Sequence, residues 1–150
     1  MRVFNGLDDF ASAVGTVLGT SDWMLISQEM IQGFADITGD DQWIHVDPSR
    51  ARQGPFGTTI AHGYLTVALI PALTAQVFVI EGVISRINYG SNRVRFPAPV
   101  PAGSRLRAVV ELLDLKRTSH GATATHQVTL ELEGSTRPAC IAETVARITC

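Results

Sequence analysis

A carboxylate and an imidazole lie close together in a polar stretch near residue 40. Residues 38–47 read Thr-Gly-Asp-Asp-Gln-Trp-Ile-His-Val-Asp, so Asp40 precedes His45 by five positions. On an irregular loop these two side chains can converge, and a carboxyl group paired with a histidine suits general acid–base chemistry near neutral pH. Spacing alone favours a simpler interpretation, in which Asp40 and Asp41 brace the loop and His45 is a hydrogen-bonded turn residue.

A second polar stretch, Thr58-Thr59-Ile60-Ala61-His62-Gly63-Tyr64, begins a segment that we expect to be helical. The first N–H groups of a helix have no partner within it, and a glycine there lets a ligand approach them closely. Such N–H groups can hold a developing oxyanion. The alternative is that Gly63 serves tight packing and that His62 is a polar cap.

Other kinds of site have less support. No helical HxxxH or CxxC spacing indicates metal binding by the local donors, which are Asp40, His45, Asp47 and His62. No Ser or Cys lies in a nucleophile elbow. His126 falls on the apolar side of its strand and is expected in the core. Arg93 and Arg95 share a strand face, which is solvated or contacts a phosphate.

The elements expected around these residues indicate an α+β fold. Ser27 is a good N-cap for a helix that ends at Gly39, and Asp47-Pro48 predicts a short helical turn after the polar loop of residues 39–47. A long apolar helix is expected from near Ala61. After it, the alternation of apolar and polar residues predicts four antiparallel strands, at 83–96, 104–117, 122–133 and 138–149. One apolar helix followed by such a sheet predicts a sheet curled around the helix.

Composition limits the classes of protein that the chain can belong to. Its 150 residues carry a net charge of −2, which argues against a dedicated nucleic-acid binder. Residues 53–80 contain no charged side chain. The apolar part, residues 64–80, is at the short limit for a membrane span and includes Thr66, Pro71, Thr74 and Gln76, so a buried helix is expected instead. Two cysteines fit a reducing, cytoplasmic setting. We expect a single domain over residues 1–150, with residues 1–20 as an uninformative extension.

Taken together, the motifs resemble the MaoC-like family of (R)-specific enoyl-thioester hydratases, which have the hot-dog fold. The likeness covers residues 21–149 and is carried by Phe34-Ala35-x-x-Thr38-Gly39-Asp40, Ile44-His45-x-Asp47-Pro48 and Phe56-Gly57-x-x-Ile60-Ala61-His62-Gly63. The segments Ile87-Asn88-Tyr89-Gly90 and Val94-Arg95-Phe96-Pro97-Ala98-Pro99-Val100 are similar to the branch related to nodulation protein N. Two positions depart from the pattern: Gln42-Trp43 stands where Asn-Pro is usual, and Pro71 where some members carry a serine.

The resemblance implies hydration of a trans-2-enoyl thioester to the (R)-3-hydroxyacyl thioester, or the reverse reaction. It implies that Asp40 and His45 are the catalytic pair and that the Gly63 N–H binds the thioester carbonyl. Supporting or substrate-binding roles fall to Gln42, His62, Tyr64 and Arg95. The expected substrate is an acyl-CoA or acyl-carrier-protein thioester, with no cofactor, no metal, no nucleic acid and no membrane partner.

Two alternatives remain open on the same fold: a hydrolase of acyl thioesters, and a non-catalytic subunit that binds them. Either way a homodimer is expected, because the free edges of a hot-dog sheet need covering.

Overall fold

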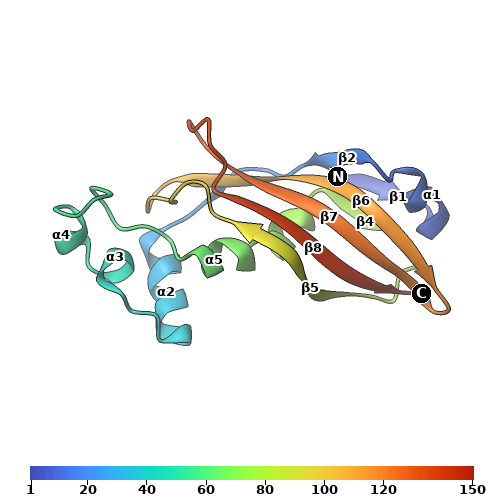
Figure 1. Ribbon diagram of the computed structural model, residues 1–150, viewed down its shortest axis with the longest axis horizontal. Helices are drawn as coiled ribbons and strands as arrows, with labels where there is room; N and C mark the ends of the chain where they lie inside the picture. Colours follow the sequence, from blue (N-terminus) through green and yellow to red (C-terminus); the bar gives the residue numbers. More distant parts are fainter.

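The computed structural model describes residues 1–150, and its largest element is a six-stranded sheet with the path β2-β6-β7-β8-β5. Three strand pairs, β6 with β7, β7 with β8 and β8 with β5, are antiparallel and continuous over most of their length (Figure 1). The four strands predicted from the sequence are confirmed, with each end within three residues, as β5 (Ser85–Arg95), β6 (Arg105–Thr118), β7 (Gly121–Leu132) and β8 (Cys140–Thr149). β2 (Thr16–Thr20) and β3 (Met24–Leu25) both pair with β6.

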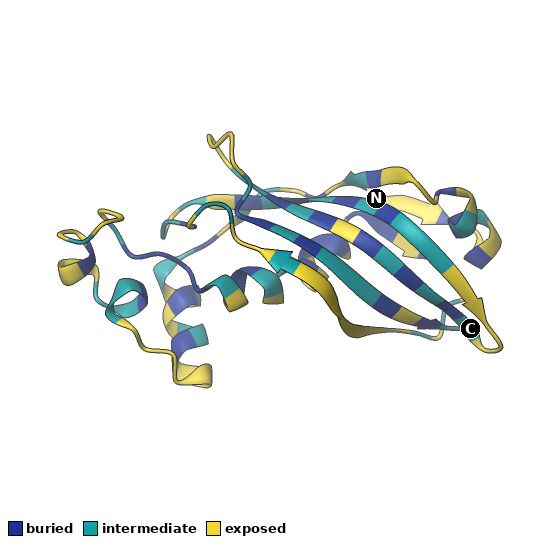
Figure 2. Ribbon diagram, in the orientation of Figure 1, coloured by how far each residue is buried: buried dark blue, intermediate teal, exposed yellow.

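The sheet buries one side of its strands, as the alternation in β7 predicts. Along β7 the buried side chains are Ala122, Ala124, His126, Val128 and Leu130, while their neighbours are partly or fully exposed (Figure 2). Leucines, valines and alanines from β6, β7 and β8 join the same core. His126 is therefore a core residue, as expected.

The helix that was expected to be long and continuous is two short helices. α5 (Gly63–Ala68) and α6 (Ile70–Thr74) are separated at Leu69, and the chain then enters a short strand, β4 (Phe78–Ile80). Pro71 explains the break, because it has no N–H and its ring would collide with the carbonyl four residues earlier in a straight helix. Only one side of α5–α6 is buried, since Tyr64, Ala68, Pro71 and Ala72 are exposed, so the prediction of a helix buried all round is wrong. The helical part also ends well before Ile80.

The first twenty residues are part of the core, which corrects the expectation that they form an uninformative extension. β1 (Arg2–Phe4) pairs in parallel with β4, and α1 (Gly6–Ser12) follows it. Phe4 and Phe10 are 1% and 0% exposed and contact Phe78 with ring centroids 6.3 and 5.4 Å apart. This N-terminal unit closes the end of the molecule that is opposite the helices of residues 28–51 (Figure 1).

Three further helices lie at the other end. α2 (Gln28–Thr38) starts at Ser27, whose side-chain oxygen accepts the Met30 N–H, and stops at Gly39 in the left-handed conformation. Both ends were predicted from the sequence. The expected loop of residues 39–47 contains a helical turn, α3 (Trp43–Val46). α4 (Pro48–Ala51) follows Asp47, which accepts the Arg50 N–H as an N-cap.

A second, smaller core joins this helical end to the sheet. It contains residues from α2, from the segment before α5 and from the start of β6, namely Ile26, Ile31, Ala61, Leu65, Val100, Leu106 and Ala139. None of the helices is both long and apolar enough to span a membrane. The small core packs the first half of α2 against the beginning of α5.

Candidate active site

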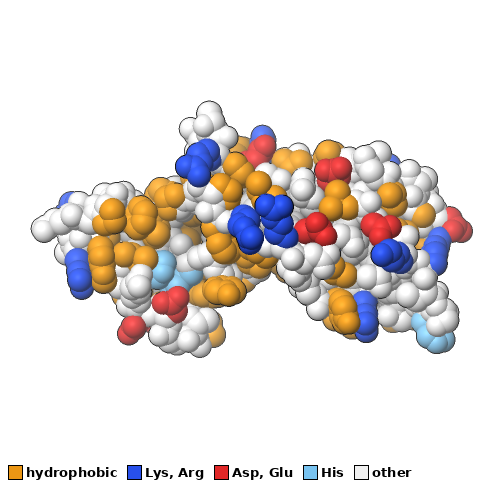
Figure 3. Space-filling view, viewed as in Figure 1, with side chains coloured by type: hydrophobic (Ala, Val, Ile, Leu, Met, Phe, Trp, Pro, Cys, Tyr) orange, Lys and Arg blue, Asp and Glu red, His pale blue; other side chains and the backbone are white.

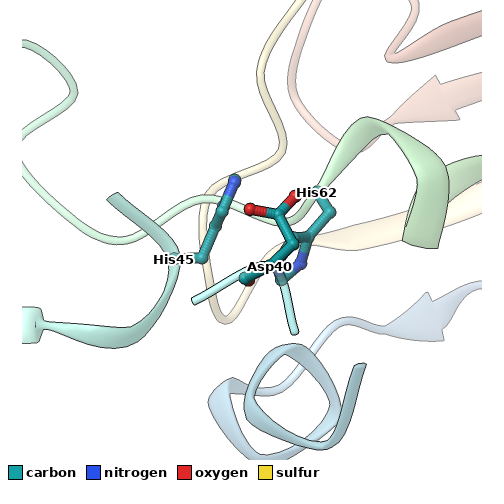
Figure 4. A group of neighbouring side chains, drawn as sticks. All are labelled: Asp40, His45 and His62. Carbon is teal, nitrogen blue, oxygen red and sulfur yellow. The ribbon is translucent and has the colours of Figure 1, made fainter. Parts of the chain in front are cut away.

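Three polar side chains from separate parts of the chain lie together at this junction. Asp40 follows the C-cap of α2, His45 is in α3, and His62 directly precedes α5 (Figure 4). One carboxylate oxygen and one nitrogen from each ring all lie within 4.8 Å of one another. Asp40 is exposed, while His45 and His62 are 8% and 2% exposed. Figure 3 shows histidine and acidic surface side by side among hydrophobic side chains at this junction, so the group is open to a ligand.

His45 is held in one orientation by the backbone of the second polar motif. Its Nδ1 lies 2.7 Å from the Ile60 carbonyl oxygen, and the Ile60 N–H in turn donates to the Ile44 carbonyl at 3.0 Å. A carbonyl can only accept, so Nδ1 carries the proton in this contact. In the neutral ring, Nε2 is then the nitrogen with the free lone pair, which is the form of histidine that can act as a base.

His62 is held in the same way and positions Asp40. Its Nε2–H donates to the Asp40 backbone carbonyl at 2.8 Å, while its Nδ1 is buried without a partner. The His62 ring stacks on the His45 ring at 3.8 Å between centroids and contacts the Phe34 ring at 5.0 Å. The carboxylate of Asp40 is therefore attached to a backbone that a buried imidazole fixes.

A side-chain network that was not predicted from the sequence holds the backbone of His45. The Thr59 hydroxyl donates to the Gln28 side-chain oxygen at 2.5 Å, and the Gln28 amide donates to the His45 carbonyl at 2.8 Å. Gln28 is the first residue of α2. No local spacing could have revealed it, because Gln28 and Thr59 are 31 positions apart.

Gly63 is the first residue of α5, and its N–H donates to no backbone carbonyl. A Cβ at this position would lie 3.0 Å from the Phe96 ring, which comes from the loop after β5. Both interpretations of this glycine hold in part, since it has a free N–H and is tightly packed. α5 has only six residues, so the local N–H group matters more here than the dipole of a long helix.

The remaining expected site residues lie outside this group. Gln42 is exposed at the start of α3, where its backbone carbonyl accepts the His45 N–H at 2.9 Å. Tyr64 is 77% exposed. The exposed guanidinium of Arg95 donates to the neighbouring Val94 carbonyl at 2.7 Å. The structure thus brings together Asp40, His45, His62 and Gly63 and leaves the other three at the surface.

The same three side chains are also the group most able to approach a cation. Their donor atoms spread over as much as 4.8 Å. Ligands that share one zinc lie only about 3.4 Å apart, given Zn–N bonds of about 2.0–2.1 Å. This donor set therefore fits proton transfer better than metal binding.

The fold and this site define a class: a hot-dog α+β domain with a carboxylate–imidazole pair at the start of its buried helix. The MaoC like domain family model matches residues 9–134. The chain belongs to the MaoC-like domain family, and the family expected from the motifs is confirmed.

Individual relatives agree with this assignment. The chain is 54% identical over 148 residues to 3-hydroxyacyl-thioester dehydratase Z of Mycobacterium tuberculosis, covering 98% of both chains. It is 46% identical to nodulation protein N of Rhizobium meliloti, over 93% of this chain and 89% of the relative. Among solved structures, an (R)-hydratase from A. caviae involved in PHA biosynthesis superposes with a TM-score of 0.73 and 25% identity, covering 89% of this chain and 95% of that one.

Proposed function

We propose that the protein is an (R)-specific enoyl-CoA hydratase, or 3-hydroxyacyl-thioester dehydratase, that adds water to trans-2-enoyl thioesters or removes it. The observation that carries the proposal is the fixed tautomer of His45. Its Nδ1–H is held by the Ile60 carbonyl, so Nε2 is free to act as a base beside the Asp40 carboxylate. By their names, the related dehydratase and the structurally similar (R)-hydratase catalyse the removal or the addition of water.

In the hydration direction, His45 Nε2 takes a proton from water as the water oxygen attacks C3 of the enoyl group. Asp40 enters this step as the carboxylic acid and supplies the proton that C2 gains, so the carbon–carbon double bond receives one hydrogen and one hydroxyl. A proton passing from His45 to Asp40 restores the pair. A positioned acid or base contributes ~10²–10⁴-fold to such a reaction.

Gly63 and His62 support this step in different ways. The Gly63 N–H, which has no backbone acceptor, is available to the thioester carbonyl, where negative charge grows as water adds to C3. His62 fixes the backbone of Asp40 and packs against the His45 ring. It thereby keeps Asp40 and His45 in place, and His62 itself does not touch the substrate. The substrate carrier in this proposal is CoA or acyl-carrier protein, and no cofactor is needed.

Hydration of crotonyl-CoA by the purified protein tests the function. We expect loss of the enoyl-thioester absorbance with formation of (R)-3-hydroxybutyryl-CoA, identified by chiral chromatography. Release of free CoA thiol would instead identify a thioester hydrolase. Binding of crotonyl-CoA by calorimetry without turnover would identify a non-catalytic subunit. Either result would overturn the proposal.

The proposal includes a homodimer and a cytoplasmic location, the latter on the basis of two free cysteines. β5 is the outer strand of the sheet and is exposed along most of its eleven residues, including Ile87 and Tyr89, which are 58% and 60% exposed. A long edge with exposed apolar side chains needs a covering strand, and the β5 of a second copy offers one.

Light scattering should give about twice the chain mass of 16.1 kDa. Ile87→Glu should shift the protein towards the monomer. Ile37→Glu is the control and should not, because Ile37 is also an exposed isoleucine but lies on α2, away from the β5 edge. A monomeric wild-type protein at assay concentration would contradict the dimer.

A further inference from the structure

A cavity of about 490 Å³ lies between α5–α6 and the sheet. Asp40, His45 and His62 do not line it. Its apolar wall comes from both helices and from strands of the sheet, and includes Val67, Ile70, Phe78, Val110 and Val128. The volume is in the usual range for a small-molecule site, so the cavity is large enough for part of a substrate.

The deep wall of this cavity contains a polar atom with no partner. His126 is 5% exposed, and its Nε2 is buried without a hydrogen bond. Buried polar atoms are nearly always paired, and an unpaired one calls for an explanation. Burial, and secondarily the charge of Arg86, lower the pKa of His126 to about 4, so the ring is neutral at pH 7 and can offer one N–H.

The cavity has one charged group, and that group is positive. Arg86 at its rim stacks over the Phe78 ring at 4.8 Å and takes part in none of the ion pairs of the chain. No Asp or Glu lines the cavity, while Thr144 lies opposite His126 on the neighbouring strand. An unpaired guanidinium beside a free imidazole and a hydroxyl is the complement of a carboxylate.

The cavity lies along the path from the site to the far end of α6. Val67, which lines the cavity, is about one helical turn, or about 6 Å, beyond Gly63, and Thr74 at the end of α6 lines the cavity too. Phe96, which contacts Gly63, directly follows β5, and β5 also forms the rim of the cavity. Gly63 and the cavity therefore lie on the same side of α5, facing β5.

We infer that this cavity binds the far end of the acyl group and favours chains of medium length that end in a carboxylate. The inference rests on the proposed function, since it assigns the substrate class of the same site. The carboxylate accepts hydrogen bonds from Arg86 and His126, while the methylene chain packs between Val67 and Ile70. Thioesters of dicarboxylic acids are the chemical class that meets both requirements.

The test compares, for wild-type protein, trans-2-enoyl-CoA esters with matched ends: octenoyl, decenoyl and dodecenoyl chains ending in methyl or in carboxylate. At one of these lengths, kcat/KM for the carboxylate chain should exceed that for the methyl chain by ~10-fold or more, the usual effect of hydrogen bonds to a charged group. A preference for methyl ends at every length would overturn the inference. If even crotonyl-CoA is not hydrated, the proposed function has failed, which is a separate result.

Variants test whether the two named groups cause the preference. Arg86→Gln should reduce the ratio of carboxylate to methyl kcat/KM to near one, and Arg86→Lys should keep part of it because the positive charge remains. Arg93→Gln is the control, since Arg93 is an exposed arginine of the same strand that does not line the cavity. An unchanged ratio in Arg86→Gln would contradict the role of this residue.

A measurement without turnover addresses His126 directly. The ligand is an acyl-CoA without a double bond that ends in carboxylate, added until every site is occupied. The pKa of the His126 ring, followed by NMR, should then rise from about 4, because a nearby anion favours the protonated ring. The matched acyl-CoA ending in methyl should leave this pKa unchanged. Equal pKa values with both ligands would overturn the inference even if the variants are unstable.

Discussion

A buried histidine with one unpartnered nitrogen lies near each end of the α5–α6 segment, His62 just before α5 and His126 in β7. The two histidines differ in what surrounds them. His62 precedes α5, donates to the Asp40 carbonyl and stacks on His45. His126 lies near α6 between aromatic rings, with Phe78 at 5.7 Å and Phe10 at 6.2 Å, and its nearest influential charge is the cation of Arg86. One is placed beside a carboxylate and a second imidazole, and the other beside a guanidinium.

The difference teaches how one residue type serves two tasks in one domain. At the α5 end, backbone carbonyls decide which nitrogen carries the proton, so the rings there can hold and transfer protons in a fixed direction. At the α6 end, burial and a neighbouring cation keep the ring neutral, so it can only donate or accept a hydrogen bond. The first end is suited to chemistry and the second to recognition.

The largest expected effect is at the α5 end. Asp40→Asn and His45→Gln should each lower kcat for crotonyl-CoA by ~10²–10⁴-fold, because each removes a group that transfers a proton. Circular dichroism should show an intact fold, since Asp40 is exposed and Gln can keep a hydrogen bond to the Ile60 carbonyl. Ordinary turnover by both variants would remove the distinction between the two ends.

At the α6 end the expected effect is on stability and its pH dependence. The pKa of His126 is about 4 in the folded protein and near 6.5 when unfolded, so between these values the unfolded chain binds more protons. The free energy of unfolding should therefore fall as pH drops from about 6.5 to 4, by about 3 kcal/mol from this residue.

Urea unfolding of wild type and His126→Gln between pH 7 and pH 4 checks this prediction. The stability difference between the two proteins should shift by that amount in favour of the variant as pH falls. His120→Gln is the matched control, because His120 is exposed in the β6–β7 turn. Parallel pH curves for wild type and His126→Gln would mean that His126 is not held neutral.

A smaller effect is expected for His62, which positions Asp40. His62→Phe keeps a ring against His45 and loses the N–H that donates to the Asp40 carbonyl. One neutral hydrogen bond corresponds to a ~3–10-fold loss, which should fall on kcat with little change in KM. His62→Asn, which retains a side-chain N–H donor, should recover part of the loss. A change in KM alone would assign His62 to substrate binding.

The smallest effect concerns the two cysteines. Burial raises the pKa of the Cys140 thiol to about 11, and Cys140 is 0% exposed in the core, whereas Cys150 is exposed at the chain end. A disulfide reagent at pH 8 should modify one thiol per chain in the folded protein and two in urea. Modification of both thiols under native conditions would indicate that the core around Cys140 opens readily.

Much of the secondary structure was predictable from local sequence patterns. The period-two pattern gave the four long strands, and Ser27, Gly39 and Asp47-Pro48 marked helix ends because capping depends on adjacent residues. For Asp40, His45, His62 and Gly63, spacing alone favoured no catalytic role, and their expected roles came from the resemblance of the combined motifs to the MaoC-like family. Contacts between distant residues could not be read in this way: the Gln28–Thr59 bond, the orphan nitrogen of His126 and the cation of Arg86 next to it all depend on the tertiary fold.

The N-terminal strand shows the same limit and has a consequence for synthesis. β1 is synthesised before its partner β4, which ends at Ile80, so β1 must remain unpaired until residues 5–77 between them have been made. Contacts between residues so far apart form slowly, and an unpaired strand is exposed to association with other chains meanwhile. The aromatic end of the domain is therefore completed late, after the segment that carries Asp40, His45 and His62 has already been synthesised.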